Sequence, residues 1–143
     1  MDLRNQPVRS VPKPRHKRRV DPQVVRGKFS KMIRDEVKAK YNNQCAMCGK
    51  RGCHIHHVMP KGRGGRGVIT NALLLCNGCH REIHAEDKLL RHWIRQFAEM
   101  YGKHFYHDRD DLQTIYRTEF GKKSNQEVQK WLEHNEVFEV FRK

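Results

Sequence analysis

Two cysteine pairs of identical spacing constrain the fold of this chain more than any other feature of the sequence. Cys45 and Cys48 form one C-x-x-C pair, and Cys76 and Cys79 form the other. Two thiolates separated by two residues can bind one side of a metal ion from a tight turn, and a second pair completes the tetrahedron that Zn²⁺ prefers. Because four cysteines leave no open coordination position, the spacing predicts a structural zinc site that stabilises a small domain.

A redox-active disulfide is the alternative interpretation of a C-x-x-C pair. Neither pair lies in the strand-to-helix context typical of thioredoxin-like chemistry, and in a cytosolic protein the spacing favours metal over disulfides. The chain contains five cysteines, so one of them, Cys53, is left over and is predicted to be a spare thiol.

The charge of the chain indicates the class of its partner. The 143 residues leave room for one domain with a modest core, and 30 Lys and Arg against 16 Asp and Glu give a formal net charge of +14. Such an excess favours a polyanion, most often nucleic acid, although a ribosome-associated or merely basic protein is the alternative. The sequence has no apolar run of membrane-spanning length, and its start, MDLRNQPVRSV, lacks the apolar middle of a secretory signal. We therefore expect a cytoplasmic location, in a bacterium or a host cell, and no membrane partner.

Hydrophobic periodicity predicts a mixed α+β organisation. Apolar residues recur at helical spacing over residues 29–41 and 89–101, and Gly102 ends the second helix. Residues 54–58 and 68–75 are predicted strands separated by a glycine-rich loop, and a further helix should begin near Cys79. After residue 102 a shorter pattern spans 112–116, Ser124 and Glu127 form a capping box, and the final VFEVF fits either a strand or a helix.

Five of the ten histidines lie between or just beyond the cysteine pairs, at positions 54, 56, 57, 80 and 84. His56 and His57 are adjacent, so on a strand they point to opposite faces, and one can bind metal while the other faces a substrate water. His80 and His84 are four residues apart, so on a helix they share one face and can meet the same ion.

The segment HIHHVMPKGRGGRGVITNALLLCNGCHREIH resembles the HNH endonuclease family. The resemblance rests on the HH pair, the Pro/Gly-rich loop, the central Asn, the L-C-x-x-C-H step and the last His, and it covers about residues 43–85. It implies an α+β fold, with a small ββα-metal (His-Me finger) core, a four-cysteine zinc site and flanking α-helices.

The resemblance also implies a role for each matching residue. His57 would be the general base, and Asn71 would hold the loop and help to orient its imidazole. His56 and His80 would bind the catalytic divalent ion, with His84 as the candidate third ligand. Because some relatives have Asp and Asn at the positions of His56 and His80, the histidine-rich set leaves the ion open among Mg²⁺, Mn²⁺, Ni²⁺ and Zn²⁺.

Two groups of cations are candidates for contacts with nucleic-acid phosphates. In the glycine-rich loop they are Lys61, Arg63 and Arg66, for which a plain exposed loop or an RGG-type RNA-binding segment is the alternative. In the proline-containing N-terminal segment they are Arg15, Lys17, Arg18 and Arg19, for which a solvated linker is the alternative.

These observations predict a basic, disordered tail over residues 1–27, a nuclease domain with the zinc site over 28–101, and a mainly helical extension over 102–143. The resemblance implies metal-dependent hydrolysis of DNA to 5′-phosphate and 3′-hydroxyl ends, and a phage or mobile-element origin. One site cuts one strand, so double-strand cleavage would need a homodimer or a larger phage or bacterial partner. The alternatives are a non-catalytic zinc-ribbon module that binds nucleic acid and an RNA-directed nuclease of the same fold.

Overall fold

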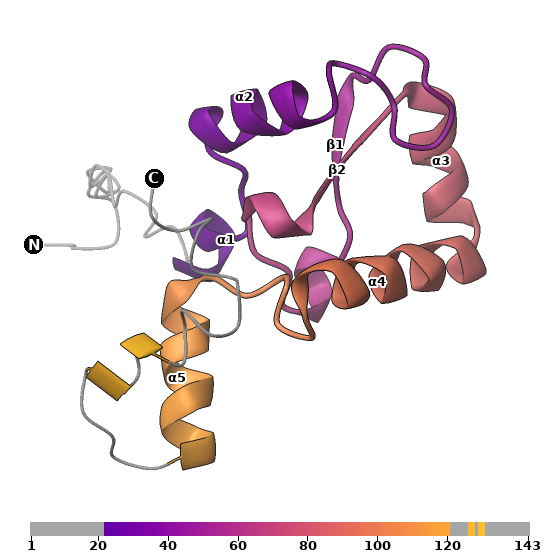
Figure 1. The fold of residues 1–143 in the computed structure, drawn as a ribbon. Coiled ribbons are helices and arrows are strands. Elements are labelled where there is room, and N and C mark those ends of the chain that lie inside the picture. Colours follow the sequence, from indigo (N-terminus) through magenta and orange to yellow (C-terminus); the bar gives the residue numbers. More distant parts are fainter. Residues whose placement is uncertain (1–21, 121–125, 128, 131–143) are drawn as a thin grey trace, which may run out of the picture.

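The computed structural model of the protein describes residues 22–120, 126–127 and 129–130. Its elements follow the order α1 (Pro22–Arg26), α2 (Lys31–Lys40), β1 (His54–His57), the 3₁₀ helices η2 (Lys61–Arg63) and η3 (Ile69–Asn71), β2 (Ala72–Leu75), α3 (Asn77–Ala85), α4 (Asp87–Tyr101) and α5 (Arg109–Phe120). The two strands lie between α2 on one side and α3 with α4 on the other (Figure 1). The predicted α+β class, with a small ββα core and flanking helices, is confirmed.

The two strands form an antiparallel pair that holds the core. His54 lies opposite Leu75, and His57 lies opposite Ala72. All four residues of β2 are buried, because successive side chains alternate between the two covered faces. Leu74 packs with Val37 of α2, whereas Leu73 and Leu75 pack with residues of α3 and α4.

Local sequence signals explain where the helices begin and end. The side chain of Ser30 caps α2 by accepting a hydrogen bond from the backbone N–H of Ile33. Gly102, with a φ of 87°, ends α4 as predicted. The sulfur of Cys76 caps α3, which therefore begins at Asn77, slightly before the predicted start.

The second predicted strand is only half correct. Residues 72–75 form β2, but residues 69–71 form the 3₁₀ turn η3, in which the N–H of Asn71 bonds to the carbonyl of Val68. The turn directs the amide of Asn71 back toward the loop after β1, as described below. Asn71, a residue type that is common in turns, interrupts the apolar run at this point.

Within the range 1–27 that was predicted to be a disordered tail, Pro22–Arg26 form the helix α1. Arg26 at the end of α1 is bound to Asp108 and Asp111 at the start of α5, so α1 lies beside α5 (Figure 1). Residues 1–21, Ser124 of the predicted capping pair and the final VFEVF fall outside the described residues. None of the described helices is both long and apolar enough to cross a membrane.

Candidate metal centres and the histidine site

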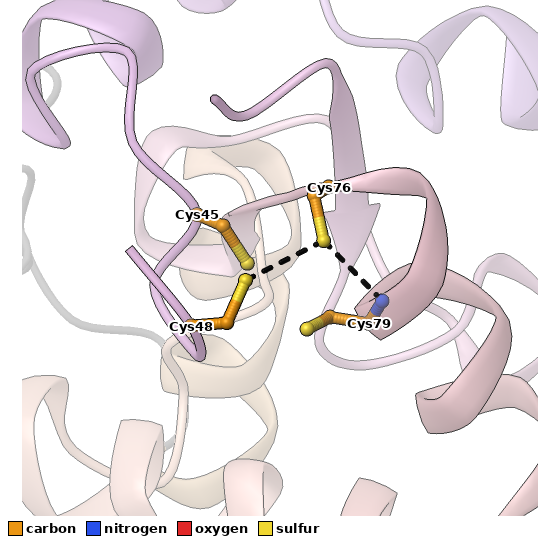
Figure 2. Close-up of side chains that lie close together, drawn as sticks. All are labelled: Cys45, Cys48, Cys76 and Cys79. Carbon is orange, nitrogen blue, oxygen red and sulfur yellow. Dashed lines mark hydrogen bonds between the residues drawn. The ribbon is translucent and has the colours of Figure 1, made fainter. Parts of the chain in front are cut away.

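Four cysteine side chains converge between the loop before β1 and the start of α3 (Figure 2). Their sulfur atoms all lie within 4.8 Å of one another, and the sulfurs of Cys48 and Cys76 are 3.6 Å apart. Tetrahedral zinc with Zn–S bonds of about 2.3 Å places its sulfurs about 3.8 Å apart. The donor set and its spacing therefore fit a closed four-cysteine zinc site, and the predicted convergence of the two pairs is confirmed.

Each cysteine pair is shaped by its own turn. In the first, the N–H of Gly49 bonds to the carbonyl of Cys45 at 2.9 Å, and the positive φ of 74° at Gly49 is one that a side chain would disfavour. In the second, the sulfur of Cys76 accepts from the N–H of Cys79 at 3.5 Å (Figure 2). Both turns bring their sulfur atoms toward one point (Figure 2).

The backbone around the cysteines favours negative charge on sulfur. Burial acts to raise the pKa of Cys45, but hydrogen bonds from the backbone of Cys76, Cys48 and Met47 lower that pKa to about 6. Burial and the neighbouring sulfurs raise the pKa of Cys79. The thiolate is the form of cysteine that binds a metal ion, and a bound cation would neutralise its charge.

A second cluster consists of His56, His80 and His84, whose ligand nitrogens lie within 4.8 Å of one another. The side chain of His56 is buried, and its Nε2 has no hydrogen-bond partner among the described residues. Burial lowers the pKa of His56 to about 4, with further lowering by His84 and His80. The imidazole is therefore neutral, which is the form that binds a metal ion.

His54 lies beside this cluster and orients it. Its ring stacks on that of His80, with the ring centroids 4.8 Å apart, and its Nε2 is 2.6 Å from Oδ1 of Asn77. His54 does not belong to the three-histidine ligand set. Its position fits that of a neighbour that fixes a ligand ring.

His57 points to the opposite face of β1, beside the N-terminal segment. Its Nε2 lies 2.7 Å from the carbonyl oxygen of Gly27, and its ring stacks on Phe29 with the centroids 4.0 Å apart. Since a carbonyl oxygen can only accept, Nε2 carries the proton and the lone pair of the neutral ring lies on Nδ1. Burial lowers the pKa of His57, although the hydrogen bond to Gly27 acts to raise it.

Asn71 is fully buried and holds the loop that follows His57. Its Oδ1 accepts from the N–H of Met59 at 2.7 Å, and its Nδ2 donates to the carbonyls of Met59 and Arg66. The loop is packed so closely that a Cβ on Gly65 would lie 1.8 Å from the carbonyl oxygen of Met59. Asn71 thus acts on His57 through the loop, whereas Gly27 provides the direct hydrogen bond.

The three predicted loop cations separate into two kinds. Lys61 and Arg63 are exposed. Arg66 is buried, with hydrogen bonds of 2.7 Å from Nε to Asp111 and from Nη1 to Gln23. Carboxylate and amide oxygens thus occupy the guanidinium of Arg66, so we do not propose it for a phosphate contact.

Arg66 belongs to an ion-pair network that the sequence did not reveal. Arg26 binds both Asp108 and Asp111, and Asp111 also binds Arg66 at 2.7 Å. Burial acts to raise the pKa of Asp111, but the two arginines lower it to about 2. The network joins α1, the loop after β1 and α5 around the residues that support His57.

Comparison with known proteins agrees with the geometry of the site. Residues 45–86 match the family model of the HNH endonuclease, which confirms the resemblance and includes both metal-ligand clusters. The chain is also similar to the type IV methyl-directed restriction enzyme EcoKMcrA of Escherichia coli (strain K12), with 30% identity over 63 residues. That similarity covers 37% of this chain and 23% of the relative, so the chain spans less than a quarter of that protein.

Proposed function

We propose, taking residues 45–86 as an HNH endonuclease domain, that the chain is a metal-dependent endonuclease that hydrolyses DNA phosphodiester bonds. The observation that carries this proposal is the arrangement along β1. His57 presents a neutral imidazole with its lone pair on Nδ1, and the adjacent His56 belongs to a cluster of three histidines. Phosphodiester hydrolysis requires a base and an open-sided cation site, and two consecutive residues of β1 contribute one to each.

The two clusters suit two ions with different tasks. Cys45, Cys48, Cys76 and Cys79 would hold a structural zinc. His56, His80 and His84 would hold a catalytic divalent ion such as Mg²⁺, Mn²⁺ or Ni²⁺, which supplies charge neutralisation at the phosphate and at the departing 3′ oxygen. Three protein ligands leave coordination positions for substrate, whereas four cysteines do not.

His57 supplies the proton transfer. Its Nδ1 would accept a proton from the water that attacks phosphorus, a contribution typically worth about 10²–10⁴-fold. The carbonyl of Gly27 keeps the other nitrogen protonated and the ring in place. Phe29 covers one face of the ring, and Asn71 fixes the backbone that follows it.

The substrate and the biological setting belong to the same proposal. DNA is favoured because the similar protein is a methyl-directed restriction enzyme and because the chain carries a net charge of +14. Products with 5′-phosphate and 3′-hydroxyl ends and a phage or mobile-element origin follow the family resemblance, and a cytoplasmic location is part of the same proposal. A single site would nick DNA, and a homodimer or a larger phage or bacterial partner would be needed for concerted double-strand cleavage.

A nicking assay on supercoiled plasmid tests the proposal. The zinc-loaded full chain, given Mg²⁺, Mn²⁺ or Ni²⁺, is expected to nick the plasmid, and His57→Ala should abolish nicking while circular dichroism stays unchanged. His92→Ala removes an exposed histidine from α4 and is the matched control. If the wild type binds plasmid but leaves it intact with every ion, the protein is a non-catalytic zinc-ribbon module. Cleavage of RNA but not of DNA would overturn the substrate assignment.

A further inference from the structure

A cavity of about 660 Å³ opens beside His57, between α2 and the loop that follows β1. His54 and His57 line it, so it extends from the candidate base to the neighbour of the three-histidine cluster. Its size falls within the range of about 300–1,000 Å³ that is usual for small-ligand sites. It therefore has room for a short stretch of one nucleic-acid strand.

The charged residues that line this cavity are all positive. Its cationic lining residues are Lys28, Arg34, Lys38 and Lys61, and no carboxylate lines it. All four are exposed, and within the described part of the chain none of them forms an ion pair. Arg26 and Arg66, in contrast, are bound to aspartates. The four cations are thus free to neutralise phosphates.

The cations lie on two walls of the cavity, on either side of a path that passes His57. Arg34 and Lys38 are four residues apart and share one face of α2. Lys61 lies on the other wall, in η2, and its aliphatic chain would touch a Cβ placed on Gly27 at 3.4 Å. His57 lies with these cations in the lining of the same cavity, so a phosphate chain that follows them passes the candidate base.

We propose that this basic groove, defined by Lys28, Arg34, Lys38 and Lys61, binds the phosphates of the DNA strand next to the bond that is cut. The inference rests on the proposed function, because it assigns the substrate-binding surface of that same site. Three of the four residues lie before the matched range 45–86, so the groove extends the site beyond the domain motif.

A second cavity on α4 provides a matched control. It has a volume of about 490 Å³, and Lys88, Arg91 and Arg95 line it together with Ile94. It shares no lining residue with the basic groove. Removing two charges from either surface changes the net charge equally, so only the position of the charges differs.

Binding is measured by fluorescence anisotropy of a labelled DNA duplex, with the zinc-loaded full chain and no added catalytic ion. Each phosphate contact contributes about −0.9 to the slope of log K against log salt. The double variant Arg34→Gln/Lys38→Gln should therefore flatten the slope by about 1.8 and weaken binding about tenfold or more at 100 mM salt. Lys88→Gln/Arg95→Gln should leave the slope unchanged, and Arg34→Lys/Lys38→Arg should bind like the wild type.

Equal losses in the two Gln variants, or an unchanged slope in the groove variant, would overturn the proposal. So would a groove variant that loses affinity for an RNA duplex of the same sequence but not for DNA. Because no catalytic ion is present, these results do not depend on cleavage. A protein that binds through the groove but fails to nick plasmid would retain the groove as a DNA-binding surface and lose the nuclease assignment.

Cys53 allows the same test without a charge substitution. This exposed thiol lines the groove, and it does not belong to the four-cysteine cluster. Saturating DNA should slow its alkylation in the zinc-loaded protein at least several-fold, as read by mass spectrometry with Cys53→Ser as the blank. An alkylation rate that DNA leaves unchanged would contradict a strand lying in the groove.

Discussion

The carbonyl of Gly27 accepts a hydrogen bond from Nε2 of His57 at 2.7 Å, across a separation of 30 residues. A backbone atom that precedes the matched domain therefore sets the tautomer of the candidate base. Arg26, the residue that precedes Gly27, forms ion pairs with Asp108 and Asp111. The orientation of His57 thus depends on segments at both ends of the described chain.

Arg26→Gln is expected to reduce the turnover of DNA cleavage with little change in KM. The substitution removes the direct ion pairs between α1 and the start of α5, which should let the carbonyl of Gly27 move away from His57. A displacement of this kind costs about 10- to 100-fold in rate. Steady-state kinetics on a nicked-product assay, with zinc content measured in parallel, provide the test.

Arg91→Gln is the control for this prediction, because it removes an exposed ion pair with Asp87 on α4. It should leave turnover and KM as in the wild type. A rise in KM alone for Arg26→Gln would instead indicate that Arg26 contacts substrate directly, and the positioning role would then be wrong.

Asp111→Asn is expected to lower the free energy of unfolding by an amount on the order of 2 kcal/mol, since its pKa falls from 3.8 to about 2 on folding. A lowered carboxyl pKa stabilises the fold above the unfolded value and loses that effect as the pH falls through the folded value. The loss should therefore be the same at pH 6 and pH 8. Urea denaturation at both values measures it.

Asp87→Asn provides the comparison for Asp111, because Asp87 forms an exposed pair with Arg91. Such pairs contribute about 0–1 kcal/mol. Similar losses in the two variants would show that the network around Arg66 contributes no more than an ordinary surface pair.

Cys48→Ser is expected to release the structural zinc and to lower the melting temperature sharply, whereas Cys53→Ser should do neither. Both cysteines are exposed, but only Cys48 belongs to the four-sulfur cluster. Loss of one of four ligands weakens a site whose binding free energy contributes to folding. Metal analysis after dialysis measures the zinc, and two variants with the same zinc content would contradict the assignment.

His84→Ala is expected to raise the Mn²⁺ concentration needed for half-maximal cleavage about tenfold or more, as for loss of a direct ligand. His54→Ala should have a smaller effect, because His54 orients the ring of His80 and lies outside the ligand set. Calorimetric titration with Mn²⁺ measures the affinity of the His84→Ala and His54→Ala variants for the ion. A larger effect for His54 would reverse their roles.

The features that could be predicted from the sequence are those built from short spacings. The turns of Cys45–Cys48 and Cys76–Cys79 and the helical pair His80 and His84 need only local geometry, and the structure brings each set together. His56 and His57 separate onto two faces because a strand alternates its side chains.

The support around His57 could not be predicted, for two physical reasons. The carbonyl of Gly27 is a backbone group, which every residue possesses, so no residue type marks it. The carboxylate partner of Arg66, Asp111, lies 45 residues later, in a segment that was assigned to a separate extension. An arginine between glycines gives the same sequence pattern whether it faces solvent or a buried aspartate.

The bridge from Arg26 to Asp108 joins positions 82 residues apart and closes the chain around the HNH segment. Grafting residues 45–86 alone onto another scaffold would transfer the metal ligands but leave behind the groups that hold His57. A portable version of this site has to include both α1 and α5. The smallest segment that could carry the site to another scaffold is therefore set by the ion pairs of Arg26 with Asp108 and Asp111, and not by the ends of the HNH motif.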